Sequence, residues 1–201
     1  MTSEEEQKAT TPEKALERLK TGHDRFLKAE RQERDLKEEV ASTSKGQNPY
    51  AFVLGCIDSR VPIETLFDEG IGDLFTARVA GNVVNEDLLG SMEFACAMAG
   101  TSLIVVLGHS SCGAVKGACN EVELGNLTPL LKKIVPAIDS VAAETDPNDT
   151  DFPDLVSREN VARSIERIRQ ESPTIKDLEE KGSVGIAGAF YDVGSGELEW
   201  L

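Results

Sequence analysis

Short apolar runs rich in β-branched residues alternate along the chain with longer segments in which apolar positions recur every three or four residues. The first pattern is typical of buried strands and the second of amphipathic helices. Four runs predict strands, over residues 51–55, 73–79, 102–107 and 184–192, and residues 197–201 follow a Gly-Ser-Gly turn as a closing hairpin. We therefore predict an α/β fold: a mainly parallel four-stranded sheet with an added C-terminal edge strand and helices on both faces.

Helical periodicity fills most of the chain between these strands. It predicts a helix that starts at a Thr10 cap and reaches Leu27, and further helices over residues 62–69, 85–99, 113–120, 128–143 (kinked at Pro136), 154–170 and 173–182. Residues 1–9 are interpreted as a frayed polar leader, and residues 40–49 and 145–153 as loops. No linker separates two domains, so residues 1–201 are predicted to form a single domain.

The first 45 residues form a polar helical arm in this prediction. Thr10 and Glu13 have the spacing of a capping box at the start of its helix. The apolar positions form a narrow stripe at helical spacing: Leu16, Leu19, His23, Phe26 and Leu27. A helix with so little apolar surface is marginal alone. We therefore expect the arm, residues 1–45, to pack on a partner subunit in a homodimer or a dimer of dimers.

The charge balance narrows the possible partners and location. The chain has 36 acidic and 21 basic residues, a formal net charge of −15. Nucleic acids and anionic membranes bind basic surfaces, so this charge argues against either partner. No signal-like region opens the sequence, and no apolar run reaches the length of a membrane span. We expect a cytoplasmic protein, in which cysteines bind metals or react more often than they form disulfides.

Two of the predicted strands end in side chains that can bind a metal. Cys56 follows the first strand, and His109 and Cys112 follow the third. The carboxyl ends of neighbouring parallel strands converge on one crevice, so we expect these three side chains to meet. Two thiolates and one imidazole suit zinc, and three protein ligands leave a fourth position for water, as in catalytic zinc sites.

The turn after Cys56 adds a carboxylate and a guanidinium, from Asp58 and Arg60. A carboxylate beside an open zinc can accept the proton of bound water. Arg60 can hold that carboxylate by a bidentate pair and keep it ionised. The alternative is a structural pair that caps the following helix. Cys96 and Cys119 lie in predicted helices without ligand partners and are interpreted as buried fillers.

The chain resembles the β-class carbonic anhydrases in two motifs, Cys56-x-Asp58-Ser59-Arg60 and His109-x-x-Cys112-Gly113. The resemblance extends over most of the chain, from the arm to the closing hairpin. It implies a carbonate dehydratase (a lyase) with one Zn²⁺ per chain, which hydrates CO2 reversibly to bicarbonate and a proton by a zinc-bound hydroxide. Asp58 would orient the hydroxide, and Arg60 would fix Asp58.

Three further positions follow from the resemblance as substrate-binding residues. Gln47 matches a family glutamine that donates a hydrogen bond to substrate or bicarbonate. Phe75 matches an aromatic residue that lines the CO2 pocket from across the subunit interface. Gly113 is expected to let the backbone approach the site closely. Phe94 stands where many relatives have a tyrosine, and we interpret it as core.

One distinction within the family can be predicted from the sequence. Some bacterial members bind bicarbonate at a non-catalytic site that includes a tryptophan, an arginine and a tyrosine, and their aspartate then closes onto zinc. Arg78 and Tyr191 match two of these residues, but Val53 stands at the tryptophan position. We therefore expect the always-open form. Two alternatives remain: hydrolysis of a CO2 analogue (carbonyl sulfide or carbon disulfide) on the same fold, and a structural or redox zinc module with a fourth protein ligand.

Overall fold

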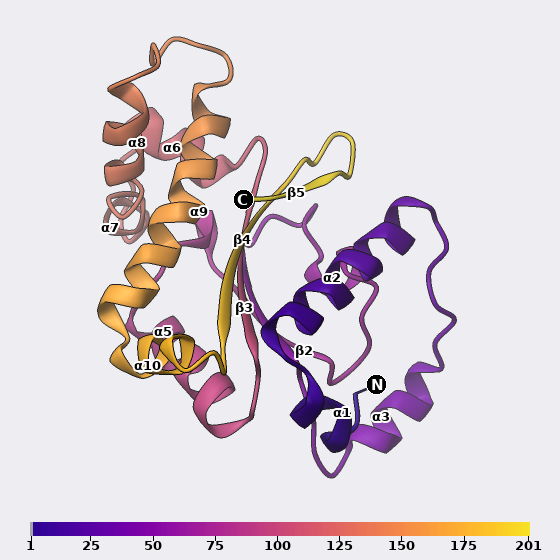
Figure 1. Ribbon diagram of the computed structural model, residues 1–201. Helices are drawn as coiled ribbons and strands as arrows, with labels where there is room; N and C mark the ends of the chain where they lie inside the picture. The colour runs from indigo at the N-terminus through magenta and orange to yellow at the C-terminus, as the bar shows by residue number, and fades with distance from the viewer. Residues whose placement is uncertain (1) are drawn as a thin grey trace.

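Five strands form one sheet in the computed structural model, which describes residues 2–201 (Figure 1). The strands are β1 (Ala51–Gly55), β2 (Leu74–Arg78), β3 (Leu103–His109), β4 (Gly185–Tyr191) and β5 (Leu198–Trp200). Their order is β2-β1-β3-β4-β5. The first four are parallel, and β5 runs antiparallel to β4. The predicted sheet, including its edge strand, is confirmed.

Helices cover both faces of this sheet, with α1, α2 and α3 on one side and α5, α9 and α10 on the other (Figure 1). Their bounds are α1 Glu4–Ala9, α2 Pro12–Leu27, α3 Leu36–Thr43, α4 Ile63–Leu66, α5 Glu86–Glu93, α6 Gly113–Cys119, α7 Leu127–Leu131, α8 Val135–Ala142, α9 Phe152–Glu171 and α10 Pro173–Glu180. A 3-10 turn, η1, spans Ala80–Asn82, and a π-helical turn, η2, extends α5 over Phe94–Met98.

The alternation of side chains along β1 explains why both faces need cover. Ala51 and Val53 join the core cluster beneath α2, whereas Phe52 and Leu54 join the cluster beneath α5, α9 and α10. All five residues of β1 are buried. A central strand of a parallel sheet therefore appears in the sequence as a continuous apolar run.

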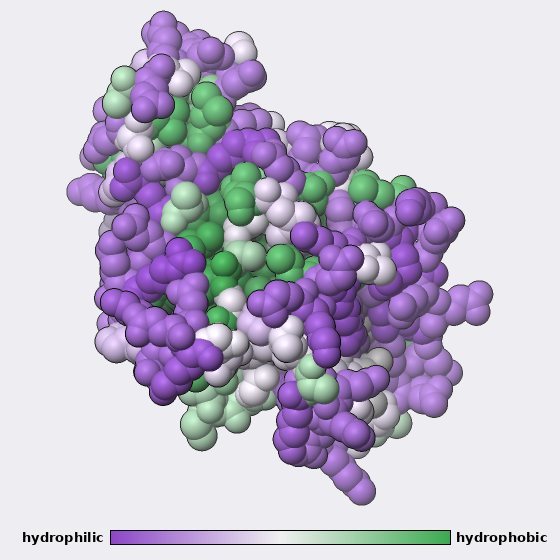
Figure 2. Space-filling model, in the orientation of Figure 1, coloured by the Kyte–Doolittle hydropathy of each residue, from purple (hydrophilic) through white to green (hydrophobic). Residues whose placement is uncertain are grey.

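The outer edge beside β4 is covered only in part. On the face shown in Figure 2, hydrophilic residues cover the helices at both margins, and apolar residues gather between them. β5 pairs only with the carboxyl-terminal half of β4, residues Ala189–Tyr191. The first three residues of β4 are accordingly half-buried. No helix among residues 2–201 combines the length and the apolar character of a membrane span.

The amino-terminal segment is more ordered than predicted. The expectation of a frayed leader over residues 1–9 is wrong for the described part, because Ser3 caps α1 in a capping box with Glu6. In α2 the cap is Thr11, which accepts a hydrogen bond from the Lys14 backbone N–H, so the capping box predicted for Thr10 is also wrong. Both caps satisfy free backbone N–H groups in the first turn of a helix. Several Ser and Thr residues in this polar segment could do so, and the sequence alone does not show which one is used.

Two further segments differ from the prediction. α3 occupies part of the expected loop over residues 40–49, and Asp35 caps its first turn. The helix expected over residues 128–143 is divided into α7 and α8, with Pro136 in the first turn of α8. A proline lacks a backbone N–H, so it is tolerated where a new helix starts, and it divides this segment rather than kinking it.

Most of the arm packs on its own chain. Ala15 and Leu19 of α2 are fully buried, and the His23 Nδ1–H donates to the Leu66 carbonyl at 3.1 Å. Only α3 has no buried residue, and it exposes Leu36 and Val40. Packing of residues 1–45 on a partner therefore remains an expectation, because α3 has no buried residue and Leu27, at the end of α2, is 44% exposed.

Candidate metal centre

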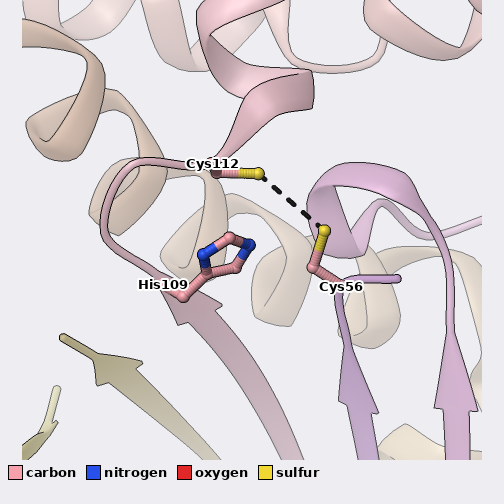
Figure 3. A group of neighbouring side chains, drawn as sticks. All are labelled: Cys56, His109 and Cys112. Carbon is pink, nitrogen blue, oxygen red and sulfur yellow. Dashed lines mark hydrogen bonds between the residues drawn. The ribbon is translucent and has the colours of Figure 1, made fainter. Parts of the chain in front are cut away.

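Three side chains meet at the carboxyl edge of the sheet, as Figure 3 shows. Cys56 directly follows β1, His109 is the last residue of β3, and Cys112 is the cap residue of α6. Their donor atoms all lie within 4.8 Å of one another. All three side chains are buried, His109 completely. The structure thus brings the predicted ligands together from two strands that are neighbours in space but more than fifty residues apart in sequence.

The geometry and the donor set fit zinc. The Cys56 and Cys112 Sγ atoms lie 3.9 Å apart. Two sulfurs about 2.3 Å from a tetrahedral ion would be about 3.8 Å apart. His109 Nδ1 lies 2.9 Å from the Ser110 carbonyl oxygen, and Nε2 has no hydrogen-bond partner. A buried acceptor without a partner is costly unless a ligand completes it, so this nitrogen fits a metal ion.

The Sγ atoms of Cys56 and Cys112 lie within hydrogen-bond distance of each other, and either thiol can be the donor. This hydrogen bond lowers the pKa of one thiol, Cys56, and raises the pKa of the other, Cys112. The Gly81 backbone N–H also points at Cys56 Sγ, at 3.4 Å. The backbone N–H groups of Ala114 and Val115, in the first turn of α6, favour the Cys112 thiolate and offset part of the rise in its pKa. A second thiolate forms here only when a cation balances the charge.

Asp58 and Arg60 form a forked ion pair beside the three ligands. Arg60 Nε donates to Asp58 Oδ1 at 3.0 Å, and Arg60 Nη2 donates to Oδ2 at 2.8 Å. The Arg60 backbone N–H adds a third bond to Oδ1, at 2.9 Å. These bonds hold the pKa of the Asp58 carboxyl well below its usual range. The pair does not cap the next helix, because α4 begins after Pro62 without a side-chain cap.

Arg78 supports this turn from the neighbouring strand. Its Nε donates to the Cys56 carbonyl oxygen at 2.8 Å, and its Nη2 donates to the Asp58 carbonyl oxygen. The sequence indicates Arg78 only as a candidate for a non-catalytic bicarbonate site and does not reveal this contact. The available signal was position: Arg78 ends β2, in register with Gly55, the residue before Cys56.

Gln47 and Phe75 are not brought to the ligands within one chain. Gln47 is exposed and precedes β1, whereas Cys56 follows it. Phe75 lies in register with Phe52, four residues before Cys56, which is about 13 Å along the strand. Its ring meets that of Phe94 edge-on, with centroids 6.2 Å apart. The interpretation of Phe94 as core is wrong for the single chain, because this side chain is 56% exposed. Gln47 and Phe75 thus lie toward the amino ends of the strands, whereas the metal ligands lie at the carboxyl ends.

Gly113 is the first residue of α6, directly after Cys112. A Cβ built there would meet no atom of the described chain within 4 Å, and the close approach of its backbone to the site stays a prediction. Cys96 and Cys119 take no part in the ligand group among the described residues. Burial raises the pKa of Cys96 to about 12 and also raises the pKa of the half-buried Cys119. Their interpretation as packing residues fits this placement.

Comparisons with known proteins agree with this geometry. The carbonic anhydrase family model matches residues 51–198. Carbonic anhydrase 2 of Mycobacterium tuberculosis is 34% identical over 193 residues, covering 93% of this chain and 91% of that one. The carbonic anhydrase of Mycolicibacterium smegmatis is 33% identical over 196 residues, covering 94% of this chain and 93% of that one.

Solved structures place the same fold around this sequence. A β-carbonic anhydrase of Aspergillus fumigatus is 30% identical, covers 82% of this chain and 81% of that chain, and has a TM-score of 0.73. One of two tetrameric β-carbonic anhydrases from Sordaria macrospora is 27% identical and covers 80% of this chain and 84% of that chain, with a TM-score of 0.72. This chain belongs to the β-class carbonic anhydrases and is a carbonate dehydratase.

Proposed function

We propose that this chain hydrates CO2 reversibly to bicarbonate and a proton, with one zinc ion held by Cys56, His109 and Cys112. The observation that carries the proposal is the buried, unpartnered Nε2 of His109 beside two thiols at the spacing of tetrahedral zinc ligands. No fourth His, Cys or carboxylate joins this group in residues 2–201, which favours an open position for solvent. When bound, zinc would act as a Lewis acid that lowers the pKa of a water molecule in that position.

The protein's own contribution is orientation and charge. Asp58 stays ionised, because Arg60 occupies both carboxylate oxygens and lowers the pKa. An ionised carboxylate accepts a hydrogen bond from the attacking nucleophile and directs its lone pair toward CO2. Arg60 Nη2 also approaches the Ser111 carbonyl oxygen at 3.4 Å, which ties the fork to the turn between His109 and Cys112. The Asp58–Arg60 pair, called the dyad below, thus keeps its place relative to both ligand-bearing turns.

The same dyad supports the always-open form. Asp58 is held by three N–H groups of Arg60 and is not part of the ligand group. Arg78, one candidate for a non-catalytic bicarbonate site, is engaged with the carbonyl oxygens of Cys56 and Asp58. Val53 is fully buried in the core where that site would need its tryptophan. The fourth position is then left to water or a small anion.

Assembly into a homodimer, or a dimer of dimers, would complete the substrate pocket. β2 is an edge strand of the sheet. Phe94, whose ring contacts Phe75 of β2, is 56% exposed, and Met98 on the same π-helical turn is 79% exposed. Gln47 and Phe75 lie toward this side of the subunit and away from their own metal ligands. A second copy that covers the β2 edge would bury the apolar residues and bring Gln47 and Phe75 to the partner's pocket.

The central test pairs zinc content with stopped-flow CO2 hydration. We expect about one zinc per wild-type chain and rapid hydration, and neither in Cys56→Ala. Cys119→Ser is the matched control, because this cysteine lies outside the ligand group, and it should keep both. Wild-type protein that binds zinc but does not hydrate CO2 would contradict the proposal. Carbonyl sulfide in the same assay separates hydrolysis of a CO2 analogue from hydration.

Bicarbonate inhibition tests the open form. We expect hyperbolic, non-cooperative inhibition, because Arg78 and Val53 do not provide a second bicarbonate site. Cooperative inhibition, or Asp58 bound to zinc in a crystal structure at neutral pH, would overturn this part of the proposal.

Sedimentation equilibrium tests the assembly. We expect wild-type protein to be a dimer or larger at micromolar concentration, and Phe94→Asp to dissociate with a loss of activity but not of zinc. Asp177→Asn, on an exposed part of α10, is the control. A fully active wild-type monomer would contradict the expectation.

A further inference from the structure

One side of α9 contacts the turn that carries His109 and Cys112 and the 3-10 turn η1, whose Gly81 N–H points at Cys56 Sγ. Asp154, Ser157 and Asn160 recur every three residues, so they lie on one side of the helix. We call these three residues the α9 ridge. Ser157 and Asn160 are buried, although α9 as a whole is a polar helix with alternating charges on its outer side. Buried polar residues need hydrogen-bond partners, and each member of the ridge has its partner next to the metal site.

Two members of the ridge hold the turn between the second and third ligands. Asp154 Oδ1 accepts a hydrogen bond from the Ser111 backbone N–H at 2.8 Å. Ser157 Oγ donates to the His109 carbonyl oxygen at 3.1 Å. Ser111 has φ +54°, a left-handed conformation that costs energy for a residue with a Cβ. The bond to Asp154 offsets part of that cost and fixes the direction from His109 to Cys112.

The third member contacts η1, the 3-10 turn that lies against Cys56. Asn160 Nδ2 donates to the Gly81 carbonyl oxygen at 2.9 Å. Gly81 itself has φ +67°, and its N–H points at Cys56 Sγ. A Cβ at Gly81 would lie 2.9 Å from Ile134 Cδ1, so the backbone here is both left-handed and tightly enclosed. Asn160 therefore fixes the backbone segment that donates a hydrogen bond to the first ligand.

A glycine lets α9 lie close enough to make these bonds. A Cβ at Gly108 would lie only 2.6 Å from Val161 Cγ2 and 3.4 Å from Ser157 Oγ. Gly108 directly precedes His109 in β3, so the closest approach of helix and strand falls beside the ligand. The ridge contacts two backbone segments, the turn at His109–Ser111 and η1, within two turns of one rigid helix. Such a helix can keep two separate loops in a fixed relative position.

We propose that the α9 ridge sets the relative geometry of the three ligands, with Asp154, Ser157 and Asn160 as positioning residues that never touch the metal. The inference rests on the proposed zinc function of Cys56, His109 and Cys112. Loss of a ridge hydrogen bond lets either the His109–Cys112 turn or η1, which donates to Cys56, move relative to the other. The affinity for the metal and its coordination geometry change as a result, whereas the fold stays intact.

Asn160→Leu is the sharpest variant, because leucine has nearly the same shape but cannot donate to Gly81. We expect its zinc dissociation constant, measured by competition with a chelator, to rise about 10-fold or more. Ser164→Ala is the matched control: Ser164 is buried one turn further along α9, and in the described structure it has no hydrogen bond to either turn. The control should bind zinc like wild type.

The visible spectrum of the cobalt-substituted protein provides a readout that a general loss of stability would not move. We expect the sulfur-to-cobalt and d–d bands to shift in Asn160→Leu and to stay in place in Ser164→Ala. Far-UV circular dichroism and thermal unfolding of the metal-free proteins show whether both variants fold. Unchanged zinc affinity and unchanged bands in a folded Asn160→Leu would overturn the inference.

Asp154 provides a second pair in case the first variant does not fold. Asp154→Asn keeps an oxygen that accepts from the Ser111 N–H, whereas Asp154→Ala loses it. We expect the asparagine variant to retain most of the zinc affinity and the alanine variant to lose it about 10-fold. Equal affinities in the two variants would contradict the inference. These readouts need no CO2. A wild-type protein that binds zinc but does not hydrate CO2 would therefore contradict the proposed function and leave the ridge inference intact.

Discussion

The two ends of β1 carry buried polar clusters of opposite character. At the amino end, Arg18 Nη2 bonds Glu69 Oε2 at 2.6 Å, and the Tyr50 hydroxyl donates to Glu69 Oε1 at 2.8 Å. Thr2 donates to Asp73 through both its N–H and its hydroxyl. At the carboxyl end, the Nε2 of His109 has no partner. The first cluster is complete within the chain, and the second needs a ligand to complete it.

The pKa shifts at the amino end show what a self-sufficient cluster does. Burial raises the pKa of Tyr50, and it raises the pKa of Glu69 despite the Arg18 bonds. Burial also acts against the ionised form of Asp73, but hydrogen bonds from Thr2 and the nearby Arg18 outweigh it and lower that pKa. These groups join the arm to the sheet. Buried charge alone is therefore no sign of a functional site, whereas an unpartnered buried acceptor beside two thiols is one.

The largest effect that would sharpen this contrast is expected at Asp58. Asp58→Asn removes the carboxylate charge beside the three ligands but leaves the ligands in place, so under the proposed function hydration should fall about 10- to 100-fold with zinc content unchanged. Stopped-flow assays and metal analysis check this result. Asp177→Asn removes a carboxylate from an exposed ion pair with Lys181 and should leave both quantities unchanged. Full activity in Asp58→Asn would remove the dyad from the mechanism.

A smaller effect, and one on stability alone, is expected at the amino end. Arg18→Ala removes the Arg18 cation from beside Glu69 and Asp73, whose side chains are 2% and 0% exposed. The free energy of unfolding should fall by about 2 kcal/mol, below the cost for a fully buried pair because Arg18 is partly exposed. Urea unfolding measures the loss. Arg163→Ala, which breaks a surface pair with Glu159, should change it far less. Loss of zinc in Arg18→Ala would contradict the separation of the two ends.

Tyr50→Phe should have a smaller effect again. It removes one hydrogen bond, from the Tyr50 hydroxyl to Glu69 Oε1, but keeps the buried ring. The free energy of unfolding should fall by about 1 kcal/mol, because the Glu69 carboxylate keeps both bonds from Arg18. Urea unfolding of Tyr50→Phe, measured together with Arg18→Ala, checks the order. A larger loss in Tyr50→Phe than in Arg18→Ala would reverse our ranking of these contacts.

The smallest expected effect concerns pH: the contribution of Asp58 to the free energy of unfolding should not change between about pH 5.5 and 9. The hydrogen bonds from Arg60 lower the folded-state pKa of Asp58 below its unfolded value. The resulting stability is fully present above the unfolded pKa, about 4, and is lost as the pH falls through the lower folded pKa. The difference in unfolding free energy between wild type and Asp58→Asn should thus be constant from about pH 5.5 to 9. A difference that varies within this range would show that Arg60 does not hold the carboxylate in solution.

The elements that the sequence predicted correctly are those set by local pattern. β1 and β3 are continuous apolar runs because both of their faces are buried, and each ends directly before or at a metal ligand. The dyad spans only three residues, so the turn after Cys56 is sufficient to pair Asp58 with Arg60. By contrast, the cap at Ser3 and the division between α7 and α8 depend on which of several equivalent polar or proline positions the packing selects.

The sequence by itself determined the parallel sheet, the placement of the ligands at the ends of its strands, and the chemistry of the Cys56, His109 and Cys112 donors. These features depend on residue type and on spacing along a strand. Only the tertiary structure decided what holds the donors in place. Asn160 contacts Gly81, which lies 79 positions away, and Arg78 contacts Cys56 across two strands. A polar residue on a helix bears no local mark of the backbone group that it will meet. That contact exists only after the hydrophobic core has brought helix and loop together.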